Sequence, residues 1–293
     1  MSDEAVLSDG TVPWAGLLAE TVARLTEAGV DDAEISARRI VEEASGWDGA
    51  DLAVHLSDPA TIRGVARLDA MVDRRLAGEP LQYVVGRWSF RTLDLMVDRR
   101  VLIPRPETEE VAGWAIGEAE RFDAPTVIDL GTGSGAIGLS VATEVATSTV
   151  LLTDVSEDAL SVARANLAGI GQAASRVSVA HGSWFEAVPG ELRGTIAVIV
   201  SNPPYVGDDE QLPEVVDRWE PRGALRSGSD GTRDLMVVVD QAAGWLRASG
   251  SVVLEMAPAQ TDAVAAQARR SGFTEVEVRS DLTGTPRSII ARK

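Results

Sequence analysis

Residues 127–138 read Val-Ile-Asp-Leu-Gly-Thr-Gly-Ser-Gly-Ala-Ile-Gly, a pattern that predicts an apolar strand, a glycine-rich turn and the start of a helix. The glycines of the turn allow the backbone to bend sharply and to approach a ligand closely. The first turn of the following helix offers free N–H groups to an anionic group. Asp129, just before the glycines, either holds the turn or contacts the ligand, and the sequence leaves both roles open.

Strands and helices alternate from this motif to the end of the chain. Apolar stretches predict strands at 126–130, 149–154, 176–180, 195–201, 251–255, 275–279 and 287–291. Helical periodicity separates most of them, over 157–169, 232–247 and 259–271. Such alternation is typical of an α/β fold with a mostly parallel sheet that helices cover on both faces.

The first 80 residues carry helical periodicity and little strand signal. One helix is predicted over 12–28, and a second opens at Asp31-Asp32-Ala33-Glu34, with an aspartate as N-cap, and ends near Gly46. A third is predicted from Asp58-Pro59, with the proline in its first turn, to Gly78. A small helical bundle of this kind recognises a partner or braces a catalytic domain.

The segment between these two regions changes character. Residues 81–85 (Leu-Gln-Tyr-Val-Val) and 93–97 (Leu-Asp-Leu-Met-Val) read as two strands joined through 86–92. A proline-bounded loop then enters a helix from about Glu107. At 293 residues the chain is long enough for two domains. We therefore expect a helical domain over 1–80, a β-hairpin linker over 81–103 and an α/β domain over 104–293.

Composition argues against several classes of protein. With no cysteine and only two histidines, His55 and His181, the chain lacks the means for a disulfide framework, a thiolate nucleophile or a histidine-based metal cluster. It has no run of 18 apolar residues and begins Met-Ser-Asp-Glu, so we expect no membrane span and no signal peptide, with the cytoplasm as the default location. The net charge of −18 disfavours a protein whose main task is to wrap nucleic acid, and it fits a partner with basic patches.

The next predicted strand ends in a carboxylate, at a spacing from the glycine-rich turn that is typical of nucleotide-binding sites. The strand over 149–154 ends in Asp154, 23 positions after Gly131, which is close to the spacing at which an acidic residue accepts hydrogen bonds from ribose hydroxyls. A nicotinamide dinucleotide site would share these features. However, the loop reads Gly-Thr-Gly-Ser-Gly, and Gly138 falls one residue late for the third glycine of the dinucleotide pattern.

Residues 202–205 read Asn-Pro-Pro-Tyr and follow the apolar strand over 195–201. Two successive prolines lack backbone N–H groups, so the chain must leave the sheet here. The Asn202 amide, fixed backbone carbonyls and the Tyr205 ring then lie at the carboxyl edge of the sheet, where open α/β sheets bind ligands. Such groups suit a site that holds a planar –NH2 group. A Pro-Pro pair alone could simply cap a strand, but its combination with the glycine-rich loop favours a site.

Together these motifs resemble the release factor glutamine methyltransferases, a family within the class I S-adenosylmethionine-dependent methyltransferases. The resemblance covers nearly the whole chain, including Gly78-Glu-Pro-Leu-Gln-Tyr83, Gly86-Arg-Trp-Ser-Phe90, Leu102-Ile-Pro-Arg-Pro-Glu-Thr-Glu109, Ser183-Trp-Phe185, Ser201-Asn-Pro-Pro-Tyr205, Trp219-Glu-Pro221 and Ala224-Leu225. The Ile-Pro-Arg-Pro-Glu-Thr-Glu segment discriminates, because the broader group of amine methyltransferases lacks it. The resemblance implies a Rossmann-like methyltransferase sheet preceded by a small all-helical domain and a β-hairpin linker.

The resemblance also implies a cofactor, a substrate and a set of site residues. The cofactor is S-adenosylmethionine, and the substrate is the glutamine in the Gly-Gly-Gln loop of class-I peptide-chain release factors, methylated on its side-chain amide nitrogen. The implied cofactor-binding residues are Gly131, Thr132, Gly133, Ser134 and Gly135 around the methionine portion, Asp154 at the ribose, Trp184 at the adenine, and Asn202. Asn202 and Pro203 would grip the glutamine amide and carry catalysis, with Pro204, Tyr205 and Arg105 also at the substrate.

The sequence departs from the family pattern in two places and leaves other functions open. Ser183 stands where relatives often have an acidic residue for the adenine amino group, and Leu254-Glu-Met-Ala-Pro-Ala-Gln260 lacks the glycine usual after the glutamate. The main alternative is an adenine-N6 or other nucleic-acid amine methyltransferase, against which the net charge of −18 argues. A non-catalytic nucleotide-binding scaffold and a nicotinamide dehydrogenase are further alternatives. We expect a protein partner, no direct nucleic acid, no membrane and no metal.

Overall fold

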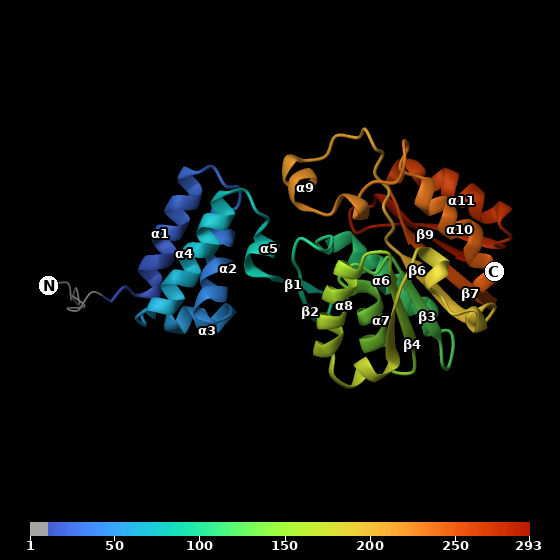
Figure 1. Cartoon of the computed structure of the whole chain (residues 1–293), viewed down its shortest axis with the longest axis horizontal. Coiled ribbons are helices and arrows are strands. Elements are labelled where there is room, and N and C mark those ends of the chain that lie inside the picture. The colour runs from blue at the N-terminus through green and yellow to red at the C-terminus, as the bar shows by residue number, and fades with distance from the viewer. Residues whose placement is uncertain (1–10) are drawn as a thin grey trace. The chain divides into compact units, whose positions relative to one another are not determined.

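The computed structural model describes residues 11–293, and the chain divides into two compact units, one up to Gly86 and one from Arg87 to Lys293 (Figure 1). The first unit is helical. Its helices are α1 (Trp14–Glu27), α2 (Ala33–Ser45), α3 (Gly49–His55), α4 (Ile62–Leu76) and α5 (Leu81–Val85). Their apolar faces enclose a core in which Leu25, Ile40, Val41 and Val72 are fully buried. The helical periodicity of the sequence therefore reflects true amphipathic helices.

Several details of the helical unit differ from what the sequence predicts. α4 begins at Ile62 and not at Asp58-Pro59, because the Thr61 hydroxyl caps it by accepting the Gly64 N–H at 3.0 Å. Pro59 instead lies before the helix, in an isolated bridge with Pro13. Asp32 occupies the N-cap position of α2, but its backbone is left-handed and its side chain makes no capping hydrogen bond. The short helix α3 was not predicted.

The segment 81–85 is helix α5, so its prediction as a strand was wrong. Five residues with three apolar side chains cannot distinguish a strand from a buried helical turn. The structure makes the choice through burial, because Tyr83 and Val84 are 2% and 3% exposed. The Arg74 guanidinium adds to this by donating to the carbonyls of both residues, at 2.8 and 3.1 Å. α5 thus belongs to the helical unit.

The hairpin lies entirely within the second unit, between β1 (Arg87–Phe90) and β2 (Leu93–Met96). The strands pair antiparallel, with Phe90 opposite Leu93, which leaves a two-residue turn. Arg91 in that turn has a positive φ of 51°, which is unfavourable for a residue with a side chain. Its guanidinium offsets this by donating to both Glu144 oxygens at 2.7 Å and to the Glu109 carbonyl at 3.0 Å.

The second unit is built on a seven-stranded sheet in the order β5-β4-β3-β6-β7-β9-β8. The strands are β3 (Thr126–Leu130), β4 (Thr149–Asp154), β5 (Val177–His181), β6 (Ile196–Ser201), β7 (Leu246–Glu255), β8 (Glu275–Ser280) and β9 (Pro286–Arg292). The first five of these run parallel, and β9 pairs antiparallel with both β7 and β8. From β3 the chain moves outward to β4 and β5 and then returns to β6 on the other side of β3. The topological switch point, where such sheets bind ligands, therefore lies between β3 and β6.

Helices cover both faces of this sheet (Figure 1). The longer ones are α6 (Pro106–Ala119), α7 (Ala136–Glu144), α8 (Glu157–Gly169), α10 (Arg233–Trp245) and α11 (Thr261–Arg270). Shorter ones are η1 (Gly171–Arg176), η2 (Trp184–Ala187), η3 (Gly190–Leu192), α9 (Glu214–Trp219), η4 (Arg222–Ala224) and η5 (Pro258–Gln260). Successive residues of a strand point to opposite faces of the sheet, so they belong to different hydrophobic cores. Val127 packs with α6, α7 and α8, and Ile128 packs with α10 and α11.

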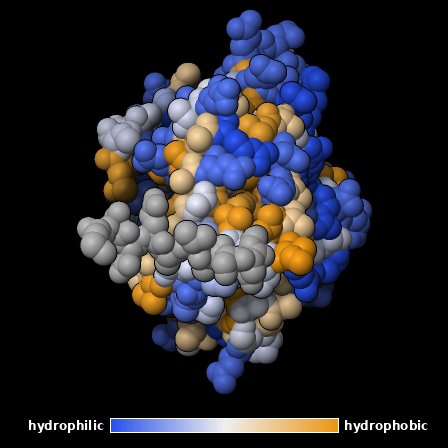
Figure 2. All heavy atoms as spheres, turned by 90° about the vertical axis from the view of Figure 1, so that its left-hand side faces the viewer, coloured by the Kyte–Doolittle hydropathy of each residue, from blue (hydrophilic) through white to orange (hydrophobic). Residues whose placement is uncertain are grey.

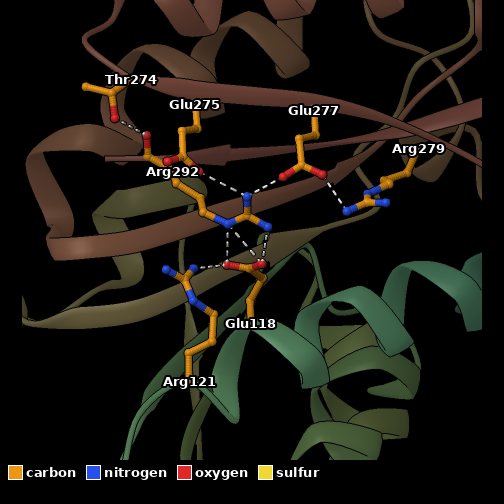
Figure 3. A network of polar contacts seen from close by, with 7 residues as sticks. All are labelled: Glu118, Arg121, Thr274, Glu275, Glu277, Arg279 and Arg292. Carbon is orange, nitrogen blue, oxygen red and sulfur yellow. Dashed lines mark hydrogen bonds and ion pairs between the residues drawn. The ribbon is translucent and has the colours of Figure 1, made fainter.

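A charged network fastens the last strand to α6 (Figure 3). The Arg292 guanidinium lies between Glu118, which is 5% exposed, and the carboxylates of Glu275 and Glu277. Burial opposes ionisation of Glu118, but hydrogen bonds from Arg292 and Arg121 outweigh it and lower the pKa of this carboxyl. The network therefore fixes the antiparallel end of the sheet against helix α6.

The structure also shows the character of the surface and which features the described residues lack. Figure 2 shows apolar side chains lying among hydrophilic ones on one face of the molecule. Among the helices described from residue 11 onward, none combines the length and the apolar character that a membrane crossing requires. The same part of the chain holds no group of three or more His, Asp and Glu side chains placed to bind a metal ion.

Candidate active site

A cavity of about 460 Å³ opens at the carboxyl ends of β3, β4 and β6, entirely within the second unit. Its volume is in the range of small-molecule sites. The structure brings most of the sequence-predicted residues to its wall: Arg105, Gly131, Thr132, Gly133, Ser134, Asp154, Trp184, Asn202 and Pro204. Gly135, Pro203 and Tyr205 are not among the lining residues. The two motifs singled out from the sequence, 70 residues apart, therefore meet in one cavity.

The glycine-rich loop turns from β3 into α7 through residues in the left-handed region. The φ angles of Gly131, Gly133 and Gly135 are 68°, 55° and 88°, which residues with a Cβ rarely adopt. Hydrogen bonds fix the loop to its neighbours, from the Thr132 N–H to the Thr153 carbonyl at 2.8 Å and from the Asn166 amide to the Ser134 carbonyl at 2.8 Å. The loop is thus a preformed wall of the cavity.

The Asp129 carboxylate supports this loop through hydrogen bonds to one of its two oxygens. Its Oδ2 accepts from the Thr132 hydroxyl at 2.6 Å and from the Gly138 N–H at 2.9 Å. Its Oδ1 is buried without a hydrogen-bond partner among residues 11–293. Burial raises the pKa of this carboxyl to about 6, against the effect of the two donors. Asp129 therefore holds the turn and also presents an unsatisfied acceptor, because it lines the cavity.

Asp154 is held at the end of β4 with its carboxylate against the loop. Its Oδ2 accepts from the Gly133 N–H and its Oδ1 from the Ser156 N–H, both at 2.9 Å. Burial raises the pKa of the Asp154 carboxyl, and hydrogen bonds from neighbouring backbone N–H groups oppose that shift. Each carboxylate oxygen can accept a second hydrogen bond, so Asp154 retains acceptor capacity toward the cavity.

Trp184 follows β5 and stands close to the glycine-rich loop. A Cβ built on Gly131 would lie 3.5 Å from its indole Cζ3. The Trp184 backbone has a φ of 46°, an unfavourable conformation for an aromatic residue. Strain of this kind collects at ligand sites, where the surrounding structure enforces it. Together with Val155 and Ile137, Trp184 gives the cavity an apolar wall.

Asn202 enters the cavity from β6, on the far side of the switch point from Asp154. The preceding residue, Ser201, ties the two strand ends together by donating its hydroxyl to the Leu130 carbonyl at 2.6 Å. The Asn202 amide nitrogen donates to the Thr108 hydroxyl oxygen at 3.2 Å. Tyr205 lies behind, with its own hydroxyl donating to Glu255 at 3.2 Å and its backbone carbonyl accepting from Gln260 at 2.8 Å.

Arg105 lines the cavity but is already paired. Its guanidinium contacts Glu220, whose side chain is 2% exposed and which also accepts the Ile103 N–H at 3.2 Å. Glu220 thereby clamps the 103–105 segment to the segment that contains α9. An Arg-carboxylate contact with one buried partner fixes geometry well. Arg105 can still offer its remaining N–H groups to a ligand.

Curated relatives of full length identify the family. A release factor glutamine methyltransferase of Cereibacter sphaeroides is 39% identical over 280 residues, which covers 95% of this chain and 98% of the relative. The enzyme of the same name from Bordetella pertussis is 39% identical and covers 86% of this chain and 92% of its own length. The chain belongs to the release factor glutamine methyltransferase family.

Two domain families match separate parts of this chain, and each match falls within one of its two compact units. Residues 16–86 match the PrmC N-terminal domain, and residues 118–260 match the methyltransferase small domain. Among solved structures, a methyltransferase from Pyrococcus furiosus is similar, with a TM-score of 0.50 over 78% of this chain and 97% of that one. At 19% sequence identity this similarity shows the fold alone, which is that of a class I methyltransferase. The fold predicted from the sequence is confirmed.

A release factor glutamine methyltransferase with a methyltransferase small domain uses S-adenosylmethionine as its cofactor. The cavity fits this group. The unsatisfied Asp129 Oδ1 suits an ammonium group, the Asp154 carboxylate suits the hydroxyls of a ribose, and the apolar wall around Trp184 suits an adenine ring. Two carboxylates also complement a cationic sulfonium electrostatically.

Sequence reasoning missed three buried groups at this site: Thr108, Glu220 and Glu255. As whole residues they are 4%, 6% and 0% exposed. Both glutamates lie within segments that carried the family resemblance or departed from it, yet each has a partner more than 100 residues away in the chain: 117 residues separate Glu220 from Ile103, and 147 separate Glu255 from Thr108. The available signal was a glutamate at the end of an otherwise apolar strand, where an unpaired carboxylate would be costly.

Proposed function

We propose that this protein transfers a methyl group from S-adenosylmethionine to the side-chain amide nitrogen of the glutamine in the Gly-Gly-Gln loop of class-I peptide-chain release factors. The observation that carries the proposal is that Asn202, from the Asn-Pro-Pro-Tyr motif, lines the same cavity as the glycine-rich loop and Asp154. The full-length similarity to enzymes named for this reaction supports it. A translation partner would place the activity in the cytoplasm.

The chemistry requires alignment more than acid-base catalysis. A glutamine nitrogen is a poor nucleophile because its lone pair is delocalised into the carbonyl group. The bound cofactor supplies an activated methyl group on a sulfonium centre. In our proposal the Asn202 side-chain oxygen and the carbonyl of the adjacent Pro203 each accept one N–H of the amide and so orient its nitrogen, although Pro203 is not among the residues that line the cavity. Such orientation can contribute roughly 7–11 kcal/mol to lowering the barrier.

The same two acceptors act electrostatically. As the nitrogen forms its new bond it becomes more positive and its N–H groups become stronger donors, and one of these protons is then released to water, which leaves a neutral N-methylamide. Acceptors fixed in advance stabilise this charge mainly in the transition state, which raises the turnover rate more than the affinity. Tyr205 and Pro204 would border the amide, and Arg105 would contact the substrate through the N–H groups that Glu220 leaves available.

On the cofactor side, we assign the groups by the chemistry of the cavity. Residues 131–135 and the free oxygen of Asp129 would hold the methionine portion, and Asp154 would accept from the ribose hydroxyls. Trp184 would pack against the adenine. Because Ser183 lines the cavity in place of an acidic residue, the adenine amino group would be recognised through a neutral partner.

The helical domain, assigned to residues 1–80 from the sequence and compact up to Gly86, would recognise the release factor. Its surface exposes large apolar side chains, with Ile35, Val54 and Ile62 at 59%, 73% and 92%. In our proposal these side chains would be buried against the release factor. The hairpin, whose strands span residues 87–96, would link this domain to the catalytic domain that we assign to residues 104–293.

The test is methyl transfer from labelled S-adenosylmethionine to a purified class-I release factor, beside the same factor with its loop glutamine changed to alanine, and beside duplex DNA. We expect label on the intact factor only. Label on DNA would favour a nucleic-acid amine methyltransferase. Equal label on the alanine variant would move the target elsewhere in the factor. Cofactor binding without transfer to any of the three would favour a scaffold.

A further inference from the structure

Behind Asn202 lies a chain of hydrogen bonds that joins three separate elements. Thr108 comes from the first turn of α6, Glu255 is the last residue of β7, and Asn202 and Tyr205 follow β6. Thr108 and Asn202 line the cavity, whereas Glu255 does not and is 0% exposed. The cavity wall at Asn202 is therefore supported by a buried carboxyl group that does not itself line the cavity.

The direction of each hydrogen bond follows from the number of protons available. When it is ionised, the Glu255 carboxylate can only accept, and its two oxygens accept from the Thr108 hydroxyl at 2.7 Å and from the Tyr205 hydroxyl at 3.2 Å. The Thr108 hydroxyl has one proton, which this bond uses. Toward Asn202 the Thr108 oxygen can therefore only accept, and at 3.2 Å it must face the amide nitrogen. A reversed amide would set two acceptor oxygens against each other.

From this we infer that Thr108 and Glu255 are positioning residues that fix the orientation of the Asn202 amide, so that its oxygen faces the substrate. The inference rests on the proposed function, in which that oxygen accepts an N–H of glutamine. It also bears on specificity. An amide fixed in this orientation presents an acceptor, which the –NH2 group of glutamine matches and the carboxylate of glutamate does not.

Further contacts keep the chain of bonds in place. Gln260 donates to the Tyr205 carbonyl at 2.8 Å and accepts the Ala257 N–H at 3.0 Å, which ties the segment after β6 to the segment after β7. The charged groups that influence Glu255 are Glu107 and Arg287. Burial raises the pKa of the Glu255 carboxyl to about 7, so at pH 8 most of it is ionised and restricted to accepting.

The experiment compares four full-length variants at pH 8 in single-turnover methylation of a class-I release factor: Thr108→Val, Thr108→Ser, Asn202→Ala and the double variant Thr108→Val/Asn202→Ala. Valine keeps the shape of threonine and removes the hydroxyl. We expect Thr108→Val to lower the rate about tenfold, as for one lost hydrogen bond, and Thr108→Ser to restore most of it. In the Asn202→Ala background, Thr108→Val should cost nothing further, because Thr108 acts through Asn202.

Two controls separate this role from a purely structural one. Thr143→Val removes a hydroxyl that bonds the Leu139 carbonyl within α7, at 2.8 Å, and should leave the rate unchanged. The affinity for S-adenosylmethionine should be the same in the wild type and in Thr108→Val. If Thr108→Val does not fold, Glu255→Met gives the same test, because it frees the Thr108 proton and should lower the rate similarly.

Failure of the inference and failure of the proposed function look different. Wild-type protein that binds the cofactor but does not methylate the release factor would overturn the proposed function, and the inference with it. A wild type that methylates, with a Thr108→Val variant that is equally fast, would overturn the inference alone. So would an equal loss from Thr108→Val in the presence and absence of the Asn202 side chain.

Discussion

At the residue scale, Asn202 is the side chain whose loss should damage the reaction most. We expect Asn202→Ala to lower turnover roughly a hundredfold or more, by analogy with the removal of one fixed partner from an oxyanion hole. Its effect on cofactor affinity should be small, because the glycine loop and Asp154 lie on the other side of the switch point. Single-turnover methylation and cofactor titration measure the two effects. Near-normal turnover would contradict the mechanism.

The sequence reveals a site residue when neighbouring residues mark its position, and it does not when the role of the residue depends on a distant contact. Gly131, Asp154 and Asn202 stand at strand ends next to glycines or prolines, so their placement at one sheet edge follows from topology rules. Thr108 carries no such signal, because its role depends on a contact with Glu255 across 147 residues. The pairing of Arg105 with Glu220 is hidden for the same reason. Long-range partners of buried polar groups require the folded structure.

At the scale of elements, the contact of α7 with β3 and β4 depends on Gly138. A Cβ at this position would lie 2.2 Å from the Leu152 Cδ2 atom and 3.0 Å from the Asp129 carboxylate, and Leu152 is fully buried. We expect Gly138→Ala to lower the free energy of unfolding by about 1–3 kcal/mol, the usual cost of overpacking. Denaturant unfolding of the cofactor-free protein measures it.

The matched control is Gly117→Ala in α6, where a Cβ would meet nothing within 4 Å. This change should stabilise the protein by about 0.5–1 kcal/mol, because alanine loses less backbone entropy in a helix than glycine does. Because both substitutions add one methyl group to a helix, the comparison isolates the close approach at Gly138. Similar effects from the two substitutions would mean that α7 can move away from the sheet at little cost.

The elements themselves were predictable where their patterns were long. β3, β4 and α8 end where the apolar runs and helical periods end. Helix α5 was not predictable, because its five residues are too few to show a hydrophobic periodicity. They are held by hydrogen bonds from Arg74 and by burial in the helical unit. The same helix moves the boundary of that unit from residue 80 to Gly86. Short elements therefore follow tertiary contacts more than local sequence.

At the scale of the whole molecule, buried carboxyl groups should make stability fall as pH rises. Burial raises the pKa of Glu255 from 4.5 to about 7 and that of Asp129 from 3.8 to about 6. A raised pKa means that the folded protein keeps a proton that the unfolded chain has lost. The stabilisation by Glu255 is therefore complete below pH 4.5 and is lost as the pH rises through about 7. Glu118 has a lowered pKa and titrates below this window.

Comparison with Glu255→Gln isolates this contribution, because glutamine is uncharged throughout. Between pH 5 and pH 8 the free energy of unfolding of the wild type should fall relative to the variant, by on the order of 3 kcal/mol at most. A difference that stays constant with pH would contradict the raised pKa. The ionised form that costs stability is also the one that restricts Thr108 to accepting from Asn202. The fold would thus give up stability at pH 8 to hold the substrate-facing amide in one orientation, a trade-off common at active sites.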